Sequence, residues 1–286
     1  MTSTTTTTTA STFWLGTSWK MTKTLAEAGD YADELRTAAL AGQVPPELRL
    51  FVLPPVTALA TVRDRLDGAQ LDRARLLLGA QNAYPGPEGP VTGEVSMGMV
   101  RDAGARMVEL GHAERRTLLG ETDELIAAKV AAAVSAGLIP LVCVGETAAE
   151  RDRGDTASVV AGQVRAALGG LGRLAPAELL IAYEPHWAIG AQGRAAAPDD
   201  VADGLAVVRQ VLAEELPDST TGVLYGGSVD AGNAADLASG LDVDGLFVGR
   251  AAWTAAGLLD LAHRCADAAR AHSTTDQVPA IVRKDR

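Results

Sequence analysis

Eight short apolar runs alternate with helical stretches along this chain, and this alternation is what most constrains its fold. Each run is apolar or β-branched and ends in turn residues, which is typical of buried strands. We expect strands at Thr12–Thr17, Arg49–Leu53, Leu76–Gln81, Arg106–Leu110, Ile139–Val144, Leu179–Glu184, Gly222–Tyr225 and Gly245–Val248. Ala- and Leu-rich amphipathic stretches between them predict helices, among them Leu25–Leu40, Glu124–Ala136, Asp199–Leu216 and Ala255–Ala271.

Strands that alternate with helices predict an α/β fold with a parallel sheet, and eight such strands close into a (β/α)8 barrel. An open doubly wound sheet is the alternative. No Gly-x-Gly-x-x-Gly turn follows the first strand, which argues against the dinucleotide-binding form of that sheet. With 286 residues and no Pro/Ser-rich linker, we expect one barrel domain over residues 12–272. A disordered Thr-rich leader (1–11) would precede it and a polar tail (273–286) would follow.

Net charge, apolar segments and cysteines indicate which partners and which compartment to expect. A net charge of −11 disfavours nucleic-acid and anionic membrane surfaces as partners. No apolar run reaches membrane-spanning length, and the Thr tract lacks the apolar core of a signal peptide. Cys143 and Cys265 lie in apolar contexts, which indicates structural thiols in a reducing compartment. We therefore expect a cytoplasmic protein, with core packing favoured over nucleophilic chemistry for Cys143.

Polar residues of unusual kind follow the predicted strands at their C-terminal ends. In barrels of this type the reacting groups lie on the loops at that end. Because these loops converge on one rim, we expect the polar residues to meet there. They are Lys20 after the first strand, His112 and Glu114 after the fourth, Glu184 at the end of the sixth, Gly226–Ser228 after the seventh, and Gly249 with Arg250 after the eighth.

Each of these residues has a chemical and a structural interpretation. Glu184 ends an apolar strand and precedes a proline and a glycine-bounded segment, as a general base beneath a hinged loop would; it could equally cap the next helix. Lys20 could hold a phosphate as a point charge, or be solvated. His112 opens a predicted helix and could donate a hydrogen bond to a carbonyl, or be a satisfied structural histidine.

The remaining candidates concern anions, charge pairs and metals. Gly226–Ser228 offers backbone N–H groups to an anion, although such a pair of glycines is often only a turn. Glu114 is either a buried acid that pairs with neighbouring charges or a helix-start carboxylate favoured by the helix dipole. We favour structural roles for Arg115 and Arg116. None of the four histidines has the spacing of a zinc ligand pair, so no metal is expected.

These residues closely resemble the triosephosphate isomerase family, over a span from about Phe13 to Ala268. The most specific marks of the resemblance are Trp19–Met21, Glu109–His112, Ala182–Pro185, Trp187–Gly190 and Tyr225–Val229. The resemblance implies a TIM barrel and a cofactor-independent sugar-phosphate isomerase that works through an enediolate. It assigns the base to Glu184, as the family uses a glutamate, and enediolate stabilisation to a neutral His112 and to Lys20.

Binding and assembly follow from the same resemblance. Gly190, Ser228, Gly249 and neighbouring N–H groups would hold the phosphate of a small phosphorylated sugar. The segment Pro185–Arg194 would be the closing lid that excludes water. The loop Gly86–Glu94, with Thr92, resembles the family's dimer loop and implies a homodimer.

This sequence departs from the family pattern at four places that would surround the substrate. Ser18 replaces the usual asparagine, His186 replaces a small aliphatic residue, Arg250 replaces a phosphate-binding glycine, and the lid segment Gly190–Arg194 is about one residue longer. Because these changes leave Lys20, His112 and Glu184 intact, they suggest a related substrate. The opening Gly16–Met21 and the ending Gly249–Trp253 resemble the branch of the family that acts on erythrulose phosphates. This predicts conversion of L-erythrulose 1-phosphate to D-erythrulose 4-phosphate, with Ser18 giving room or a hydroxyl to the added hydroxymethyl group.

Three other functions remain as alternatives. The first is triosephosphate isomerase activity itself, on dihydroxyacetone phosphate and glyceraldehyde 3-phosphate. The second is a Schiff-base aldolase on the same barrel, with Lys20 as nucleophile. The third is a sugar-phosphate-binding barrel without catalysis, to which the altered lid gives some support.

Overall fold

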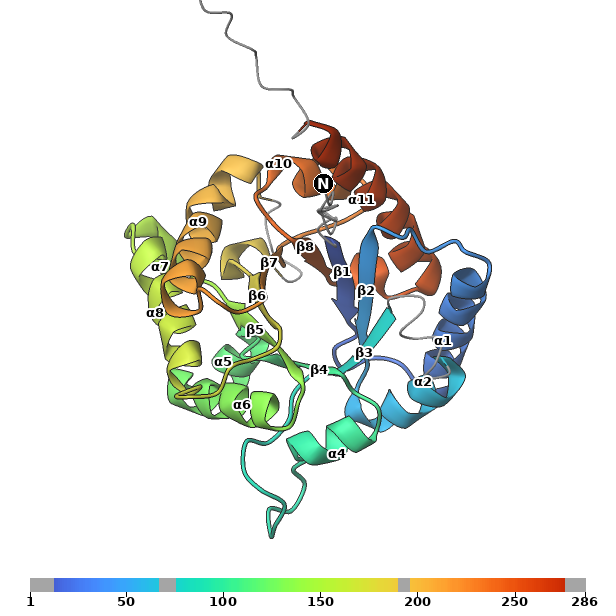
Figure 1. Ribbon diagram of the computed structural model, residues 1–286, viewed down its shortest axis with the longest axis horizontal. Coiled ribbons are helices and arrows are strands. Elements are labelled where there is room, and N and C mark those ends of the chain that lie inside the picture. The colour runs from blue at the N-terminus through green and yellow to red at the C-terminus, as the bar shows by residue number, and fades with distance from the viewer. Residues whose placement is uncertain (1–12, 67–75, 190–195, 276–286) are drawn as a thin grey trace, which may run out of the picture.

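The strands form a closed parallel barrel (Figure 1). The computed structural model describes residues 13–66, 76–189 and 196–275, so the predicted leader and most of the predicted tail lie outside it. β1 pairs with both β2 and β8, which closes the sheet and rules out the open alternative. The strands are β1 (Phe13–Ser18), β2 (Leu48–Leu53), β3 (Leu76–Ala80), β4 (Met107–Leu110), β5 (Ile139–Val144), β6 (Leu179–Tyr183), β7 (Thr221–Tyr225) and β8 (Gly245–Val248). All eight predicted strands are confirmed, each within one residue at either end.

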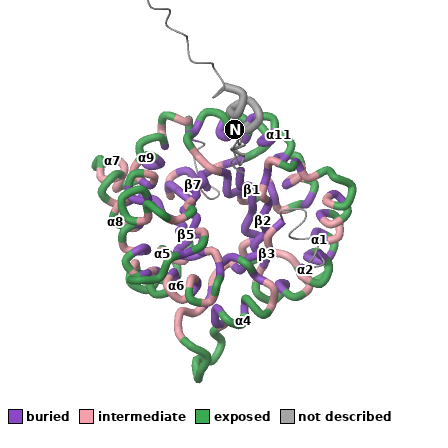
Figure 2. The backbone as a smooth tube through the Cα atoms, viewed as in Figure 1, coloured by how far each residue is buried: buried purple, intermediate pink, exposed green. Residues whose placement is uncertain are grey.

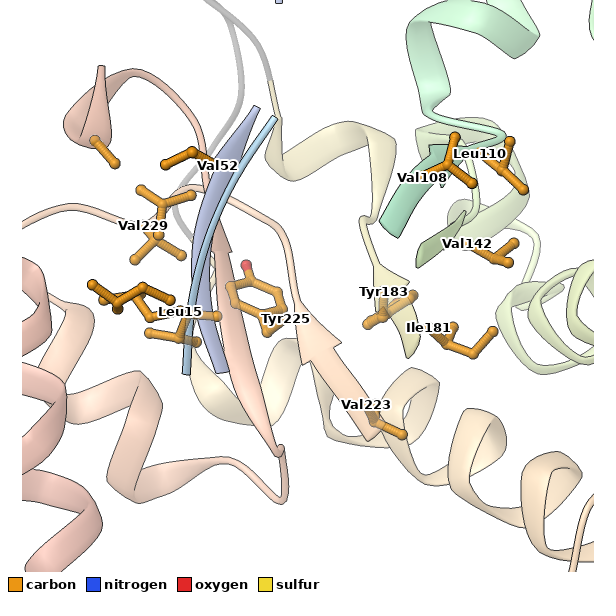
Figure 3. Packing of buried hydrophobic residues seen from close by; sticks show 14 of the residues in the cluster. Leu15, Val52, Val108, Leu110, Val142, Ile181, Tyr183, Val223, Tyr225 and Val229 are labelled. Atoms are coloured by element: carbon orange, nitrogen blue, oxygen red, sulfur yellow. The ribbon is translucent and has the colours of Figure 1, made fainter. Parts of the chain in front are cut away.

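Successive side chains of each strand face opposite sides of the sheet and build two separate cores. The inner core fills the barrel and includes Phe51, Met107, Leu141, Leu180 and Phe247. The outer core lies between the sheet and the helices, and Figure 3 shows part of it, with Leu15, Val52, Ile181 and Val223 among its members. The barrel is therefore a packed interior, and open space is found at one of its ends.

Helices surround the barrel, and their buried sides face it while their exposed sides face outward (Figures 1 and 2). Thr24 begins α1 with a capping box in which its side chain accepts from the Glu27 N–H. The α-helices are α1 (Leu25–Leu40), α2 (Leu59–Leu66), α4 (Met97–Asp102), α5 (Ala113–Leu119), α6 (Asp123–Ser135), α7 (Ala148–Asp152), α8 (Thr156–Gly169), α9 (Pro198–Glu215), α10 (Ala234–Gly240) and α11 (Ala255–Thr275). Three short 3-10 helices, η1 (Val56–Ala58), η2 (His186–Ala188) and η3 (Arg250–Ala252), complete the description.

The four named helix predictions are confirmed, and only one boundary differs by more than one residue. The last helix, α11, continues to Thr275 rather than ending at Ala271. Within the described residues, no helix combines the length and the hydropathy that crossing a bilayer requires.

Candidate active site

A pocket of about 610 Å³ opens at the C-terminal ends of the strands. Its lining comes from the loops after β1, β4, β6, β7 and β8, so segments far apart in the sequence meet there. Gly190 is the one predicted site residue that lies outside the described residues. The other predicted residues all line this pocket: Ser18, Lys20, His112, Glu114, Glu184, Ser228, Gly249 and Arg250.

Lys20 lies in a strained turn that hydrogen bonds from Gln81 stabilise. Its φ of 54° lies in the left-handed region, which residues other than glycine seldom adopt. Gln81 Nε2 donates to the Lys20 carbonyl at 3.0 Å and to the Leu53 carbonyl at 2.8 Å, which stabilises the turn. The Lys20 Nζ lies 2.6 Å from Glu114 Oε1. This ion pair fixes the ammonium group at the pocket wall.

Of the two interpretations of Glu114, the structure contradicts that of a buried acid. Its side chain is 48% exposed, so it is not a buried acid, although it does pair with a neighbouring charge. It stands in the first turn of α5, where the helix dipole favours a carboxylate. Of the neighbouring arginines, Arg115 pairs with Glu121 and Arg116 with Asp123, in agreement with structural roles.

His112 caps the N-terminus of α5 through its ring, and this contact determines which ring nitrogen carries the proton. Its Nδ1 accepts a hydrogen bond from the Glu114 backbone N–H at 3.1 Å, so Nδ1 is unprotonated. The proton of the neutral ring is then on Nε2, which lies 3.5 Å from Glu184 Oε2. Burial, and after it the charge of Lys20, lower the pKa of His112 to about 4. His112 is therefore a neutral hydrogen-bond donor near pH 7.

Glu184 lies directly after β6, with its side chain 4% exposed. Its backbone N–H donates to the Val144 carbonyl at 2.7 Å, which extends the pairing with β5. Gly226 leaves the space for the carboxylate, because a Cβ there would lie 2.9 Å from Glu184 Oε1. Burial raises the pKa of Glu184 well above its ordinary value, and the charge of Glu109 raises it further. Its Oε2 has no hydrogen-bond partner among the described residues.

A second buried acid, Glu109, lies behind this group. It is only 2% exposed, and its Oε2 has no hydrogen-bond partner among the described residues. The pKa of Glu109 is raised to about 7, chiefly by burial, and the charge of Lys20 opposes this rise. Cys143 is buried, and burial raises the pKa of its thiol, with the charges of Glu184 and Glu109 raising it further. Cys143 therefore packs in the barrel as an un-ionised thiol, as its apolar context predicted.

Another part of the pocket wall is built from the loops after β7 and β8. Ser228 Oγ donates to the Ala188 carbonyl at 2.7 Å, and Asn233 Nδ2 donates to the Ser228 carbonyl at 2.9 Å. In the described part of the chain, the N–H groups of Gly227 and Ser228 donate to no protein acceptor. Trp253 Nε1 donates to the Ser18 carbonyl at 3.0 Å and so ties this end to β1.

The segment after β6 is anchored by one carboxylate. Glu146 accepts from Trp187 Nε1 at 2.8 Å and from the Tyr183 hydroxyl at 3.0 Å, while its carbonyl accepts from the His186 N–H at 2.9 Å. The Arg151 guanidinium stacks over the Trp187 ring at 3.9 Å. The beginning of the predicted lid is thus fixed, while residues 190–194 lie outside the described residues.

Together these groups can carry out one kind of chemistry. A carboxylate, a neutral imidazole N–H and an ammonium group face a common space, as proton transfer at a carbon beside a carbonyl requires. A sequence profile of the family described as triosephosphate isomerase matches residues 13–265. The chain belongs to the triosephosphate isomerase family.

Curated relatives within the triosephosphate isomerase family match this chain over nearly its whole length. A protein of Mesorhizobium japonicum named L-erythrulose-1-phosphate isomerase is 46% identical over 260 residues, covering 90% of this chain and 98% of that protein. A Brucella abortus protein of the same name is 46% identical over 265 residues, covering 91% and 99%. One from Mycolicibacterium smegmatis is 46% identical over 248 residues, covering 87% and 91%.

Reasoning from triosephosphate isomerase motifs missed three residues that shape the pocket. Gln81 is predicted only as a strand end, and Glu146 has no predicted role. Glu109 was read as part of the motif that leads to His112. A signal for Glu109 was nonetheless present, because it alternates with Val108 and Leu110 and so shares the inward face of β4 with Met107.

Proposed function

We propose that this protein is an isomerase that interconverts L-erythrulose 1-phosphate and D-erythrulose 4-phosphate through an enediolate. The observation that carries the proposal is the meeting of Glu184 and His112, 3.5 Å apart, with the Lys20 ammonium in the same pocket. Two relatives that are 46% identical and are named L-erythrulose-1-phosphate isomerase support the choice of substrate.

Glu184 is the proposed base. Its carboxylate removes the proton from the hydroxyl-bearing carbon beside the carbonyl, and the electron pair of that C–H bond forms the double bond of the enediolate. The carbonyl oxygen takes up the negative charge. After a proton has moved between the two oxygens, Glu184 returns its proton to the former carbonyl carbon, so the carbonyl has shifted by one position and nothing else is consumed.

His112 and Lys20 are the proposed stabilisers of the enediolate oxygens. The His112 Nε2–H is a neutral donor already directed at the site, and an ammonium group stabilises negative charge as it develops. Because Lys20 is ion-paired with Glu114, it serves as a hydrogen-bond donor rather than as the neutral amine of a Schiff-base aldolase.

The phosphate end is assigned to the loops after β7 and β8. Gly227 and Ser228 offer backbone N–H groups, and Gly249 and Arg250 line the same wall. Backbone donors suit a phosphate group, and Arg250 adds a positive charge at the rim. Gly190 and the rest of the Pro185–Arg194 segment would close over the substrate from the anchored Trp187.

Triosephosphate isomerase activity is the competing function, because the family is described by that name. Values of kcat/KM measured side by side for L-erythrulose 1-phosphate and D-glyceraldehyde 3-phosphate separate the two. We expect a preference for the four-carbon substrate of at least tenfold. A preference of that size for the triose phosphate would overturn the proposal and leave the catalytic assignment intact.

We further propose that the protein is a homodimer that associates through the loop between β3 and α4, which projects from the barrel beside α4 in Figure 1. Met21 is 98% exposed and Val91 38% exposed, so apolar side chains are unburied on the rim and on this loop. Light scattering coupled to size exclusion should give a dimer mass for the unsubstituted protein and a monomer mass for Thr92→Arg. A monomer mass for the unsubstituted protein would contradict this.

A further inference from the structure

The turn after β8, which carries part of the proposed phosphate site, is too short to be stable alone. Gly249 and Arg250 line the pocket, and Arg250 begins η3, a 3-10 helix of three residues. Within the turn, the Ala252 N–H donates to the Gly249 carbonyl at 3.1 Å and the Trp253 N–H donates to the Arg250 carbonyl at 3.2 Å. Because a single helical turn is unfavourable to form by itself, contacts from elsewhere must fix its position.

Those contacts come from β1 and the segment that follows it. The Lys23 Nζ donates to the Trp253 carbonyl at 2.6 Å, and a hydrogen bond with a charged donor is stronger than a neutral one. The buried Tyr31 hydroxyl donates to the Ala252 carbonyl at 3.0 Å. In the opposite direction, Trp253 Nε1 donates to the Ser18 carbonyl at 3.0 Å. Side-chain hydrogen bonds therefore fix the turn after β8 against the β1 side of the barrel.

The Lys23 ammonium group is placed by a strained backbone and by two aromatic rings. Lys23 has a φ of 76°, in the left-handed region that residues other than glycine seldom adopt. Its Nζ lies 5.1 Å from the centre of the Trp19 ring and 5.3 Å from that of the Tyr31 ring, which are favourable cation–π contacts. Backbone strain of this kind persists only where the surrounding structure stabilises it, and it is concentrated at functional sites. The placement of this ammonium group therefore calls for a role.

We infer that Lys23 and Tyr31 are positioning residues that fix the turn after β8 for the phosphate of the substrate. The inference rests on the phosphate assignment within the function proposed above. Neither residue lines the pocket, so both act through the turn that carries Gly249 and Arg250 rather than on the substrate itself. Because the turn already has its position before the substrate arrives, binding does not have to order it, and the affinity for the phosphate group is higher.

Four variants separate this role from a general effect on stability. Lys23→Met removes the ammonium group, Lys23→Arg retains a charged donor, and Tyr31→Phe removes only the hydroxyl. Arg36→Met is the control, because it removes a positive charge from α1 where the Arg36 side chain is 41% exposed and pairs with Asp33. For each variant, KM and kcat are measured with the sugar phosphate that the unsubstituted protein prefers, together with the inhibition constant Ki of inorganic phosphate. Circular dichroism melting curves verify folding, and Tyr31→Phe decides the matter if Lys23→Met does not fold.

Lys23→Met and Tyr31→Phe should each raise KM and the phosphate Ki by roughly threefold to tenfold, because binding must then order the turn. The value of kcat should change less than KM, since a phosphate group that does not react is bound alike in the ground state and the transition state. Lys23→Arg should recover most of the loss seen in Lys23→Met. Arg36→Met should leave KM and Ki unchanged.

A merely structural role gives a different result. Lower melting temperatures with an unchanged phosphate Ki in Lys23→Met and Tyr31→Phe would overturn the inference. An equal rise of Ki in Arg36→Met would overturn it as well, because the effect would then reflect net charge alone. Failure of the proposed substrate is distinguishable from both: the unsubstituted protein would prefer the triose phosphate, while the Ki values, which depend only on the phosphate group, would still decide the roles of Lys23 and Tyr31.

Discussion

The proposed base is an acid that the fold keeps away from water. Glutamine has nearly the shape of glutamate but cannot act as a base. Glu184→Gln should therefore lower kcat by about 10²–10⁴-fold, the usual contribution of a positioned base. The matched control is Glu178→Gln, at the opposite end of the same strand, where Glu178 pairs with Arg49. We expect the control to leave kcat within about twofold. Steady-state kinetics measure kcat for both variants. An unchanged kcat in Glu184→Gln would exclude Glu184 as the base.

The two central residues also predict how activity depends on pH. Burial raises the pKa of Glu184 above its ordinary 4.5, and a base works only when ionised. Activity should therefore fall as pH decreases through that raised pKa, so the acid limb of kcat/KM lies above pH 4.5. The pKa of His112, lowered to about 4, keeps its ring neutral throughout. Nitrogen NMR of labelled histidine should show no titration of His112 between about pH 5 and 8; an imidazolium at pH 7 would contradict this.

Residues at the site differ in how far the sequence could predict them. Lys20, His112 and Glu184 follow strand ends in recognisable motifs, and a parallel barrel brings strand ends together, so their meeting could be predicted. The inward direction of Glu109 follows from the alternation along β4, but its nearly complete burial depends on how the barrel packs around it, which a local pattern does not give. The 48% exposure of Glu114 likewise depends on how α5 lies on the rim.

At the scale of elements, the end of β6 is positioned by close packing against the turn after β5. A Cβ at Gly145 would lie 2.1 Å from the Glu184 carbonyl oxygen and 2.5 Å from its carbon, and these backbone atoms cannot rotate away. Gly145→Ala should therefore displace Glu184 and lower kcat/KM by about 10- to 100-fold, since a shift near 1 Å has such effects. It should also lower the melting temperature.

Gly162→Ala is the matched control for this prediction. Gly162 lies in the exposed face of α8, and a Cβ there meets nothing within 4 Å. Alanine favours a helix interior by about 0.5–1 kcal/mol over glycine, so the control should keep full activity and melt no lower. If both variants lose activity equally, the packing of Gly145 against Glu184 does not explain the effect.

Among the helices, long ones could be predicted from the sequence and short ones could not. α1 and α9 have 16 and 18 residues, enough for helical periodicity and caps to be recognised. α5 and α7, with 7 and 5 residues, are too short for periodicity to separate them from loops. Closure of the sheet between β1 and β8 joins the two ends of the chain and depends on shear and tilt, which local sequence does not encode.

At the scale of the whole molecule, one buried ion network joins separate parts of the barrel wall. Lys129 of α6 is ion-paired with Glu121 and also donates to Asn82 Oδ1, after β3, at 2.8 Å. Arg115 of α5 donates to the same Glu121 carboxylate at 2.5 Å. Lys129 and Glu121 have side-chain exposures of only 4% and 3%, so solvent screens their attraction weakly. The network therefore connects β3, α5 and α6 on the side of the barrel that carries His112.

Lys129→Met should destabilise the fold by about 3 kcal/mol, because it leaves the Glu121 carboxylate buried with only Arg115 as a charged partner. Lys129→Met/Glu121→Leu should recover part of that loss, since no unpaired buried acid remains. Urea unfolding midpoints measure both, and Arg165→Met, which removes an exposed pair with Glu214, should leave the midpoint nearly unchanged. If the double variant is less stable than Lys129→Met, the Glu121 carboxylate is stabilised by Arg115 alone, and Lys129 contributes packing rather than charge.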